Sequence, residues 1–251
     1  MAEIKPLSSG GVHFFDNIPV KLDVLQLASK IGIEPGRNGF DLFASLAGQA
    51  LERGRPKALY RIAYIEGRAT DTVLIDGVTF KSRILSVNLE NAGRVFLYVV
   101  TCGAELQQWS EDLDEPLMSY FADYIKESVL YSSRRFLFSY LEGEYRLPRY
   151  STMAPGSLKD WPIEQQKPLF RILGGSNDLI GVRLTGSCLM IPGKSLSGIL
   201  FPSEQSFESC MLCKRENCPN RKTEYSPETF SSYGNGAGHS DETVYKGGGK
   251  G

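Results

Sequence analysis

The stretch TVLIDGVTFKS, at 72–82, is the part of this 251-residue chain that most constrains its fold. It places Asp76 and Gly77 between two short apolar runs. An Asp-Gly pair in this setting favours the tight turn of a β-hairpin, because both residues adopt the backbone conformation with positive φ that such a turn requires. We therefore predict two antiparallel strands that are joined at Asp76-Gly77.

Two segments that follow the hairpin predict further strands. Leu85, Val87 and Leu89 alternate with polar residues, which is the period of a strand with one buried face. The run RVFLYVVTCG, at 94–103, is apolar over most of its length and is typical of a more fully buried strand. Together with the hairpin, these segments predict an antiparallel sheet.

Apolar residues at helical spacing predict the helices of the chain. The spacing predicts helices within 19–33 and 39–54, a long helix over about 117–141, and a short helix that begins near Pro168 and ends at Gly174. Strand-like runs interrupted by Gly and Pro follow at 180–201. The last residues, 226–251, are rich in Gly and poor in apolar residues, so we predict a disordered tail there.

Composition excludes several classes of protein. The formal net charge is −1 and the basic residues are scattered, which argues against a nucleic-acid or anionic-membrane partner. The first residues lack the apolar core of a signal peptide, and no stretch approaches the roughly 20 apolar residues that span a bilayer. We therefore expect a cytoplasmic protein without a membrane or nucleic-acid partner.

Three of the five cysteines lie within nine positions, spaced C-x2-C-x4-C, which favours a metal site in a reducing compartment over a disulfide framework. Basic neighbours at 214, 215, 221 and 222 are expected to favour the thiolate form that binds metal. A structural zinc site needs a fourth ligand, for which Cys188 and His239 are the candidates, whereas an iron–sulfur cluster can be held by three thiolates. Unligated thiols or a redox pair are the alternative. The predicted metal ligands are Cys210, Cys213 and Cys218.

Two blocks of sequence carry a resemblance to a known family. The first is the Ala-Pro-Gly turn at Ala154–Gly156 with the short helix after it, and the second is IGVRLTGSCLMIPGKSLSGILF at 180–201. In their order and spacing they resemble the activation domain of cobalamin-dependent methionine synthase, and in particular its stand-alone relatives. The resemblance is tight over about 50 residues and looser over 16–145, where the predicted elements run in a compatible order. It implies an α+β fold in which a curved antiparallel sheet has flanking helices.

The resemblance also implies a function. That family binds S-adenosylmethionine and presents it to a corrinoid whose cobalt has been oxidised to Co(II), so that reductive methylation returns the cofactor to its cycle. It implies that this chain is the reactivation component of a corrinoid methyltransferase such as methionine synthase, with two partners. One is a corrinoid protein, or a methionine synthase that lacks its own activation domain, and the other is an electron donor. The interrupted strands at 180–201 are then expected to form a shallow seat for the corrinoid.

Some motif positions depart from the family pattern. The Arg and Tyr of its Arg-x-x-x-Gly-Tyr motif correspond to Thr152 and Ser157, although Arg149 lies three positions upstream of Thr152. Two hypotheses stay open: a reactivation protein that binds S-adenosylmethionine, and a metal-stapled scaffold subunit of a methyl-transfer complex that has lost this ligand. The cofactor-binding residues that the resemblance implies are Arg149, Met153, Ala154, Pro155, Gly156, Ser157, Ser197 and Gly198.

The chain is accordingly divided into four predicted regions. Residues 1–15 are an N-terminal extension, and 16–207 form the activation-domain-like α+β domain. Residues 208–225 are the Cys-rich metal or cluster segment, and 226–251 are the disordered tail.

Overall fold

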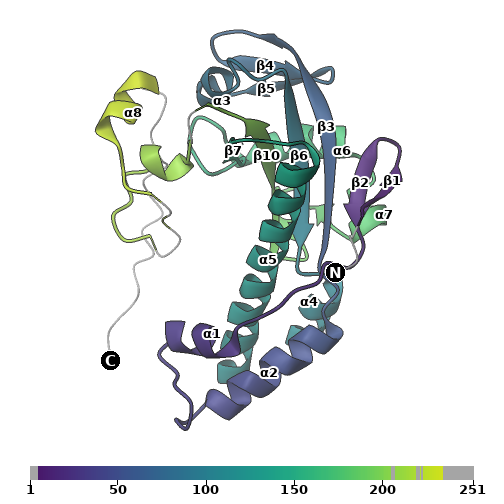
Figure 1. Cartoon of the computed structure of the whole chain (residues 1–251), viewed down its shortest axis with the longest axis vertical. Coiled ribbons are helices and arrows are strands. Elements are labelled where there is room, and N and C mark those ends of the chain that lie inside the picture. Colours follow the sequence, from purple (N-terminus) through teal and green to yellow (C-terminus); the bar gives the residue numbers. More distant parts are fainter. Residues whose placement is uncertain (1–4, 205–206, 219–220, 222, 234–251) are drawn as a thin grey trace.

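The computed structural model describes residues 5–204, 207–218, 221 and 223–233. Its main feature is an eight-stranded antiparallel sheet in the order β1-β2-β3-β6-β10-β7, with the β4–β5 hairpin paired to the end of β3 (Figure 1). A separate two-stranded sheet joins β8 to β9. The strands are β1 (Leu7–Ser9), β2 (Val12–Phe15), β3 (Lys57–Arg68), β4 (Thr72–Ile75), β5 (Val78–Lys81), β6 (Arg94–Thr101), β7 (Tyr150–Met153), β8 (Arg183–Leu184), β9 (Met190–Ile191) and β10 (Ser195–Pro202).

Helices cover both faces of the main sheet. In Figure 1 the long helix α5 runs along one face, with α1, α2 and α4 near one of its ends. Helices α6 and α7 lie behind the sheet in this view and pack on its other face. The helices are α1 (Val24–Lys30), α2 (Phe40–Arg53), α3 (Arg83–Asn88), α4 (Ala104–Glu111), α5 (Pro116–Glu144), α6 (Gln166–Leu173), α7 (Ser176–Ile180) and α8 (Pro227–Tyr233), with the 3₁₀ helices η1 (Ile163–Gln165) and η2 (Ser209–Leu212).

The core is divided by the sheet, and β6 shows how. Side chains alternate between the two faces of a strand, so a strand covered on both sides is apolar throughout. On β6, Val95, Leu97 and Val99 belong to the cluster under α6, whereas Phe96 and Tyr98 belong to the cluster under α5. This two-sided cover explains why the run at 94–103 contains so few polar residues.

The structure confirms several of the sequence predictions. The hairpin turn falls at Asp76-Gly77, where both residues have positive φ, 43° and 72°. The buried strand is β6, and the long helix is α5, which begins with Pro116 in its first turn and buries Phe121, Ile125 and other apolar residues. The fold class is α+β with a large antiparallel sheet, as expected.

The strand expected around Leu85 is instead the helix α3. Its N-cap is Ser82, whose hydroxyl accepts a hydrogen bond from the Leu85 N–H. The carboxylate of Asp160, distant in sequence, accepts further hydrogen bonds from Ser82 and from the Ile84 N–H at 2.9 Å. These contacts satisfy the free N–H groups of the first turn, so the helix forms despite the alternating pattern.

Two of the predicted regions contain regular structure that the sequence patterns did not predict. The extension 1–15 contains β1 and β2, and β2 pairs with β3, so this segment belongs to the main sheet. The tail predicted from residue 226 begins with helix α8, which Ser226 caps by accepting a hydrogen bond from the Thr229 N–H, and Tyr233 is buried in the core. Apolar side chains anchor both segments to the sheet. The rest of the predicted tail, 234–251, lies outside the described residues.

Among the described residues, no helix has the length and apolar character needed to cross a membrane.

Candidate functional site

The Ala-Pro-Gly turn follows directly after β7. The Gly156 N–H donates to the carbonyl of Trp161 at 2.7 Å, and the Ser157 hydroxyl donates back to the carbonyl of Ala154 at 2.6 Å. Gly156 has a φ of 83°, and a Cβ there would lie 2.8 Å from the Ile163 side chain. The turn is therefore held by internal hydrogen bonds, and it requires glycine both for its backbone conformation and for space.

Ser197 and Gly198 lie on β10, beside β7, and both are buried. A Cβ on Gly198 would lie 2.6 Å from the Met153 carbonyl oxygen and 2.9 Å from the Tyr98 hydroxyl. The Ser197 hydroxyl has no hydrogen-bond partner among the described residues. Since β10 is covered on both faces, these two residues do not line an open surface. The shallow seat expected at these strands is not formed by Ser197 and Gly198.

Arg149 lies at the opposite end of β7 from the turn. Its guanidinium donates to the carbonyl of Glu204 at 2.5 Å. The side chain is exposed and lines a cavity of about 470 Å³ together with Pro148, Pro202 and Ser203. Of the predicted cofactor-binding residues, the structure thus brings Met153 next to Gly198, and it separates Arg149 from the turn by the length of β7.

Residues 203–204 and 207–213 lie near β7 and the turn. The Phe207 N–H donates to the Ser151 hydroxyl at 2.8 Å, and the hydroxyls of Ser157 and Ser209 are 3.4 Å apart. Leu212, at the end of η2, is completely buried in the core under α6. The Cys-rich segment is therefore docked against the Ala-Pro-Gly turn.

A second contact joins the C-terminal segment to the motif. The amide of Asn88 donates to the sulfur of Met153 at 3.6 Å, and its carbonyl oxygen accepts from the Tyr233 hydroxyl at 2.8 Å. A cavity of about 580 Å³ lies between α3 and the C-terminal segment, and Asn88, Phe207 and Met211 are among the residues that line it. This volume is in the range of small-molecule sites.

The three clustered cysteines are half-buried. The Cys213 N–H donates to the Cys210 carbonyl at 3.2 Å, and the Arg221 N–H donates to the Cys218 carbonyl at 3.1 Å. In the part of the chain that the structure describes, no three His, Cys, Asp or Glu side chains are gathered so as to hold a metal ion. The metal site at Cys210, Cys213 and Cys218 therefore stays a prediction. His239, one of the candidates for a fourth ligand, lies outside the described residues.

The remaining two cysteines are buried core residues. Cys102 follows β6 and is fully buried, and burial raises the pKa of its thiol to about 12. Cys188 lies between β8 and β9, is 3% exposed and has a φ of 64°. Both therefore pack as small buried hydrophobic residues, including Cys188, which the sequence also offered as a fourth zinc ligand.

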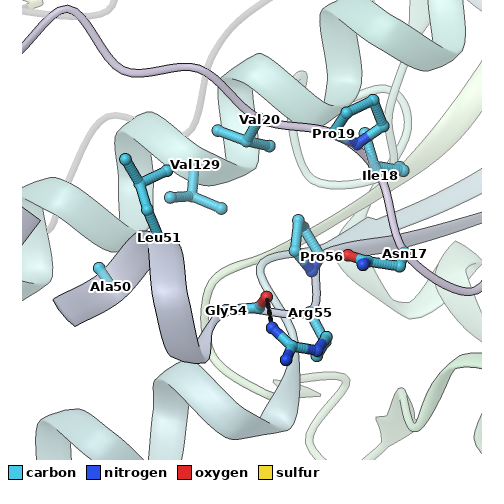
Figure 2. A pocket seen from close by; sticks show the side chains of 10 residues that line it. All are labelled: Asn17, Ile18, Pro19, Val20, Ala50, Leu51, Gly54, Arg55, Pro56 and Val129. Carbon is cyan, nitrogen blue, oxygen red and sulfur yellow. Dashed lines mark hydrogen bonds between the residues drawn. The ribbon is translucent and has the colours of Figure 1, made fainter. Parts of the chain in front are cut away.

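Another cavity lies far along the sheet from the motif turn. Figure 2 shows it between the N-terminal segment at Asn17–Val20, the end of α2 and Pro56. Its volume is about 200 Å³. One nitrogen of the Arg55 guanidinium donates to the carbonyls of Glu52 and Gly54, at 2.9 and 2.8 Å, and none of the described residues that line this cavity is a motif residue. We therefore assign the candidate site to the turn, β7 and the Cys-rich segment.

Comparison with solved structures finds a match that covers most of this chain. A crystal structure of the MetH reactivation domain bound to AdoHcy superposes with a TM-score of 0.52, over 78% of this chain and 80% of that one, at 15% sequence identity. The chain has the fold of the MetH reactivation domain. This confirms at the level of the fold the resemblance that the two sequence blocks carry.

Sequence comparison adds less. A tRNA N6-adenosine threonylcarbamoyltransferase of Agrobacterium fabrum (strain C58 / ATCC 33970) is 31% identical over 121 residues, which are 48% of this chain and 32% of that enzyme. The chain thus spans about a third of the length of that relative. No family model matches the sequence.

The sequence alone gave no sign of the contacts that assemble this site. Ser151, Asn88 and Ser209 stand in no motif, and their roles depend on chain segments that are distant in sequence. Helix α8 did have a local signal, because Ser226 followed by Pro227 is a common helix start. Arg221 was noted for its charge, whereas the structure shows its guanidinium donating to the backbone carbonyls of Cys210 and Cys213.

Proposed function

We propose that this chain is an accessory protein for reductive reactivation of a corrinoid cofactor in a methionine synthase or a related corrinoid methyltransferase. The observation that carries the proposal is the reactivation-domain fold, which extends over 78% of the chain. The corrinoid is carried by a partner protein, on which this chain docks. An electron donor supplies the electron that Co(II) needs before it can accept a methyl group.

The ligand class proposed for the Ala-Pro-Gly turn is S-adenosylmethionine. The structural neighbour was solved with AdoHcy, and the turn at Ala154–Gly156 is retained here with an exposed glycine. Thr152 and Ser157 replace the arginine and tyrosine of the family motif. A ligand that reaches both the turn and Arg149, the predicted partner of a carboxylate, has to extend along β7, because that strand lies between the two.

The Cys-rich segment supports a redox or structural centre at this site. Ser209 contacts Ser157, and Cys210 is the next residue along the chain. A metal or iron–sulfur centre held by Cys210, Cys213 and Cys218 would therefore lie beside the turn that is proposed to bind the methyl donor. We propose an iron–sulfur cluster or a zinc ion as the occupant.

The proposal is tested by following methylation of a Co(II) corrinoid protein. A methionine synthase that lacks its activation domain is mixed anaerobically with this chain, S-adenosylmethionine and a one-electron reductant, and methylcobalamin is measured by absorbance and mass spectrometry. We expect methylcobalamin only when this chain is present. No methylcobalamin in the complete mixture, with a folded protein, would contradict the proposal for this partner.

A matched pair of glycine variants locates the activity at the turn. Gly156→Ala adds a Cβ 2.8 Å from Ile163 at a φ of 83°, so it distorts the turn, whereas Gly186→Ala adds a Cβ with no atom within 4 Å. We expect Gly156→Ala to slow methylation and Gly186→Ala to leave the rate close to wild type. Circular dichroism confirms that both variants are folded.

A second candidate function is a metal-stapled scaffold that has lost S-adenosylmethionine. It is favoured by the burial of Ser197 and Gly198, and by Arg149, whose guanidinium is bonded to the Glu204 carbonyl. Calorimetry separates the two candidates. Heat of binding with S-adenosylmethionine, alone or with the corrinoid partner, supports the first, and no heat at millimolar ligand supports the second.

A further inference from the structure

Arg221 contacts the backbone of all three clustered cysteines. Its guanidinium donates to the carbonyls of Cys210 and Cys213, at 3.5 and 3.2 Å, and its own N–H donates to the carbonyl of Cys218 at 3.1 Å. The same guanidinium also donates to the carbonyls of Arg215 and Thr223. The half-buried side chain and backbone N–H of Arg221 thus form hydrogen bonds to the backbone at all three predicted metal ligands.

The planar fork of arginine suits this task. Guanidinium presents five N–H donors in a fixed geometry, whereas a lysine ammonium is a compact charge with three rotating donors. Four backbone carbonyls from 210–223 converge on the fork of Arg221. In the described part of the chain no ion pair joins this guanidinium to a carboxylate, and its hydrogen-bond partners there are backbone carbonyls. Arg221 therefore fixes the direction of the backbone carbonyls of Cys210, Cys213 and Arg215 without any metal.

The direction of the carbonyls determines the direction of the N–H groups. A trans peptide is planar, with its N–H pointing opposite to its C=O. Because the carbonyls of Cys213 and Arg215 point toward Arg221, the N–H groups of Lys214 and Glu216 point away from it. These N–H groups have no hydrogen-bond partner among the described residues. An N–H group that points away from Arg221 can donate to a thiolate sulfur, which is the kind of contact that tunes sulfur-bound metal centres.

We propose that Cys210, Cys213 and Cys218 form a three-thiolate site for a thiophilic metal centre. Arg221 is the positioning residue, because its hydrogen bonds hold the backbone that carries the three cysteines. This inference rests on the proposed function in one respect: the metal centre is the one proposed there, and Arg221 is the residue that positions its ligands. Metal binding requires the cysteine side chains to turn toward a common centre while the backbone stays in place. Each thiol releases its proton on ligation, and no electron transfer is needed for the binding step.

The experiment measures Zn²⁺ affinity by competition with a chelating dye, in the full-length metal-free protein. Arg221→Gln removes the charge and most of the donors, and Arg221→Lys keeps the charge without the fork. We expect Arg221→Gln to weaken Zn²⁺ binding by about 10- to 100-fold, the usual effect of removing a partner that orients metal ligands, with Arg221→Lys also weakened. Cys213→Ser removes a ligand and is expected to abolish tight binding.

Arg215→Gln is the matched control, because it removes the same charge from an exposed side chain of the same loop. We expect its affinity to stay close to that of the wild type. Equal weakening in Arg215→Gln and Arg221→Gln would overturn the proposal, since charge alone would then account for the effect. Wild-type affinity in a folded Arg221→Gln variant would overturn it as well.

Anaerobic reconstitution with Fe²⁺ and sulfide is the parallel arm, with cluster content read from absorbance and iron and sulfide analysis. The same ranking of variants is expected for whichever centre the wild type binds. A wild-type protein that binds neither Zn²⁺ nor a cluster would overturn this inference. It would leave the corrinoid reactivation assay unaffected, because that assay measures methylcobalamin and no metal bound to this chain. Melting temperatures of all variants establish that the comparison is made between folded proteins.

Discussion

Gly198 provides the sharpest test of how the motif on β10 works. An alanine there would place its Cβ 2.6 Å from the Met153 carbonyl oxygen and 2.9 Å from the Tyr98 hydroxyl. The carbonyl belongs to the β7 backbone, next to the Ile199–Met153 pair of the ladder, so it cannot move without disturbing strand pairing. Overpacking of this kind costs about 1–3 kcal/mol. For a chain of this size, about 1 kcal/mol corresponds to a change of roughly 2–4 °C in melting temperature. We therefore expect Gly198→Ala to lower the melting temperature by about 2–12 °C.

The assay is thermal and denaturant unfolding of the wild type, Gly198→Ala and a control, Gly48→Ala. Gly48 lies inside α2 with no atom within 4 Å of an added Cβ, so the control should gain up to about 1 kcal/mol from improved helix propensity. Unchanged stability in Gly198→Ala, with the expected gain in Gly48→Ala, would refute the reasoning. The glycine would then have to be explained by a ligand and not by the approach of β7 and Tyr98.

Three further outcomes follow from burial. Alkylation of the native, metal-free protein should label the three cysteines of the C-terminal segment and leave Cys102 and Cys188 unlabelled, and mass spectrometry that finds a label on either buried residue would contradict this. The pKa of Cys102 is raised from 9.0 to about 12, so above pH 9 the unfolded state loses the thiol proton first. The contribution of Cys102 to stability is therefore fully present below pH 9 and is lost as the pH rises toward 12. The measurement is the denaturant midpoint as a function of pH, compared between the wild type and Cys102→Ala. Leu212→Ala should remove about 2–5 kcal/mol of packing and raise hydrogen exchange over 207–218, and unchanged protection there would show that Leu212 does not anchor the segment.

Local chemistry explains which elements could be predicted from the sequence. The turn at Asp76-Gly77 and the strand β6 depend on residues that are adjacent in the chain, and both were predicted correctly. The helix α3 was predicted as a strand because Leu85 and its neighbours alternate, whereas the helix is fixed by the carboxylate of Asp160, which follows it by more than 70 positions. Sequence patterns do not contain that contact.

The candidate site shows the same division. The Ala-Pro-Gly turn and the cysteine spacing are local patterns, and both were identified from the sequence. The docking of the Cys-rich segment on the turn depends on Ser157 meeting Ser209 and on Leu212 filling the core, which only the folded chain reveals. The direction in which Ser197 and Gly198 face was also hidden, because a strand buried on both sides has no alternating pattern to read.

Three side chains of the C-terminal segment belong to the hydrophobic core under α6: Phe207, Leu212 and Tyr233. This arrangement has an evolutionary consequence. The cysteine-bearing extension cannot be gained or lost as an independent module, because its removal would leave β7 uncovered and its hydrophobic neighbours exposed to water. Homologues that lack the extension should therefore carry compensating substitutions at the positions of Met153 and Phe201. Lineages that keep it should retain the three anchoring side chains even where the cysteines have been replaced.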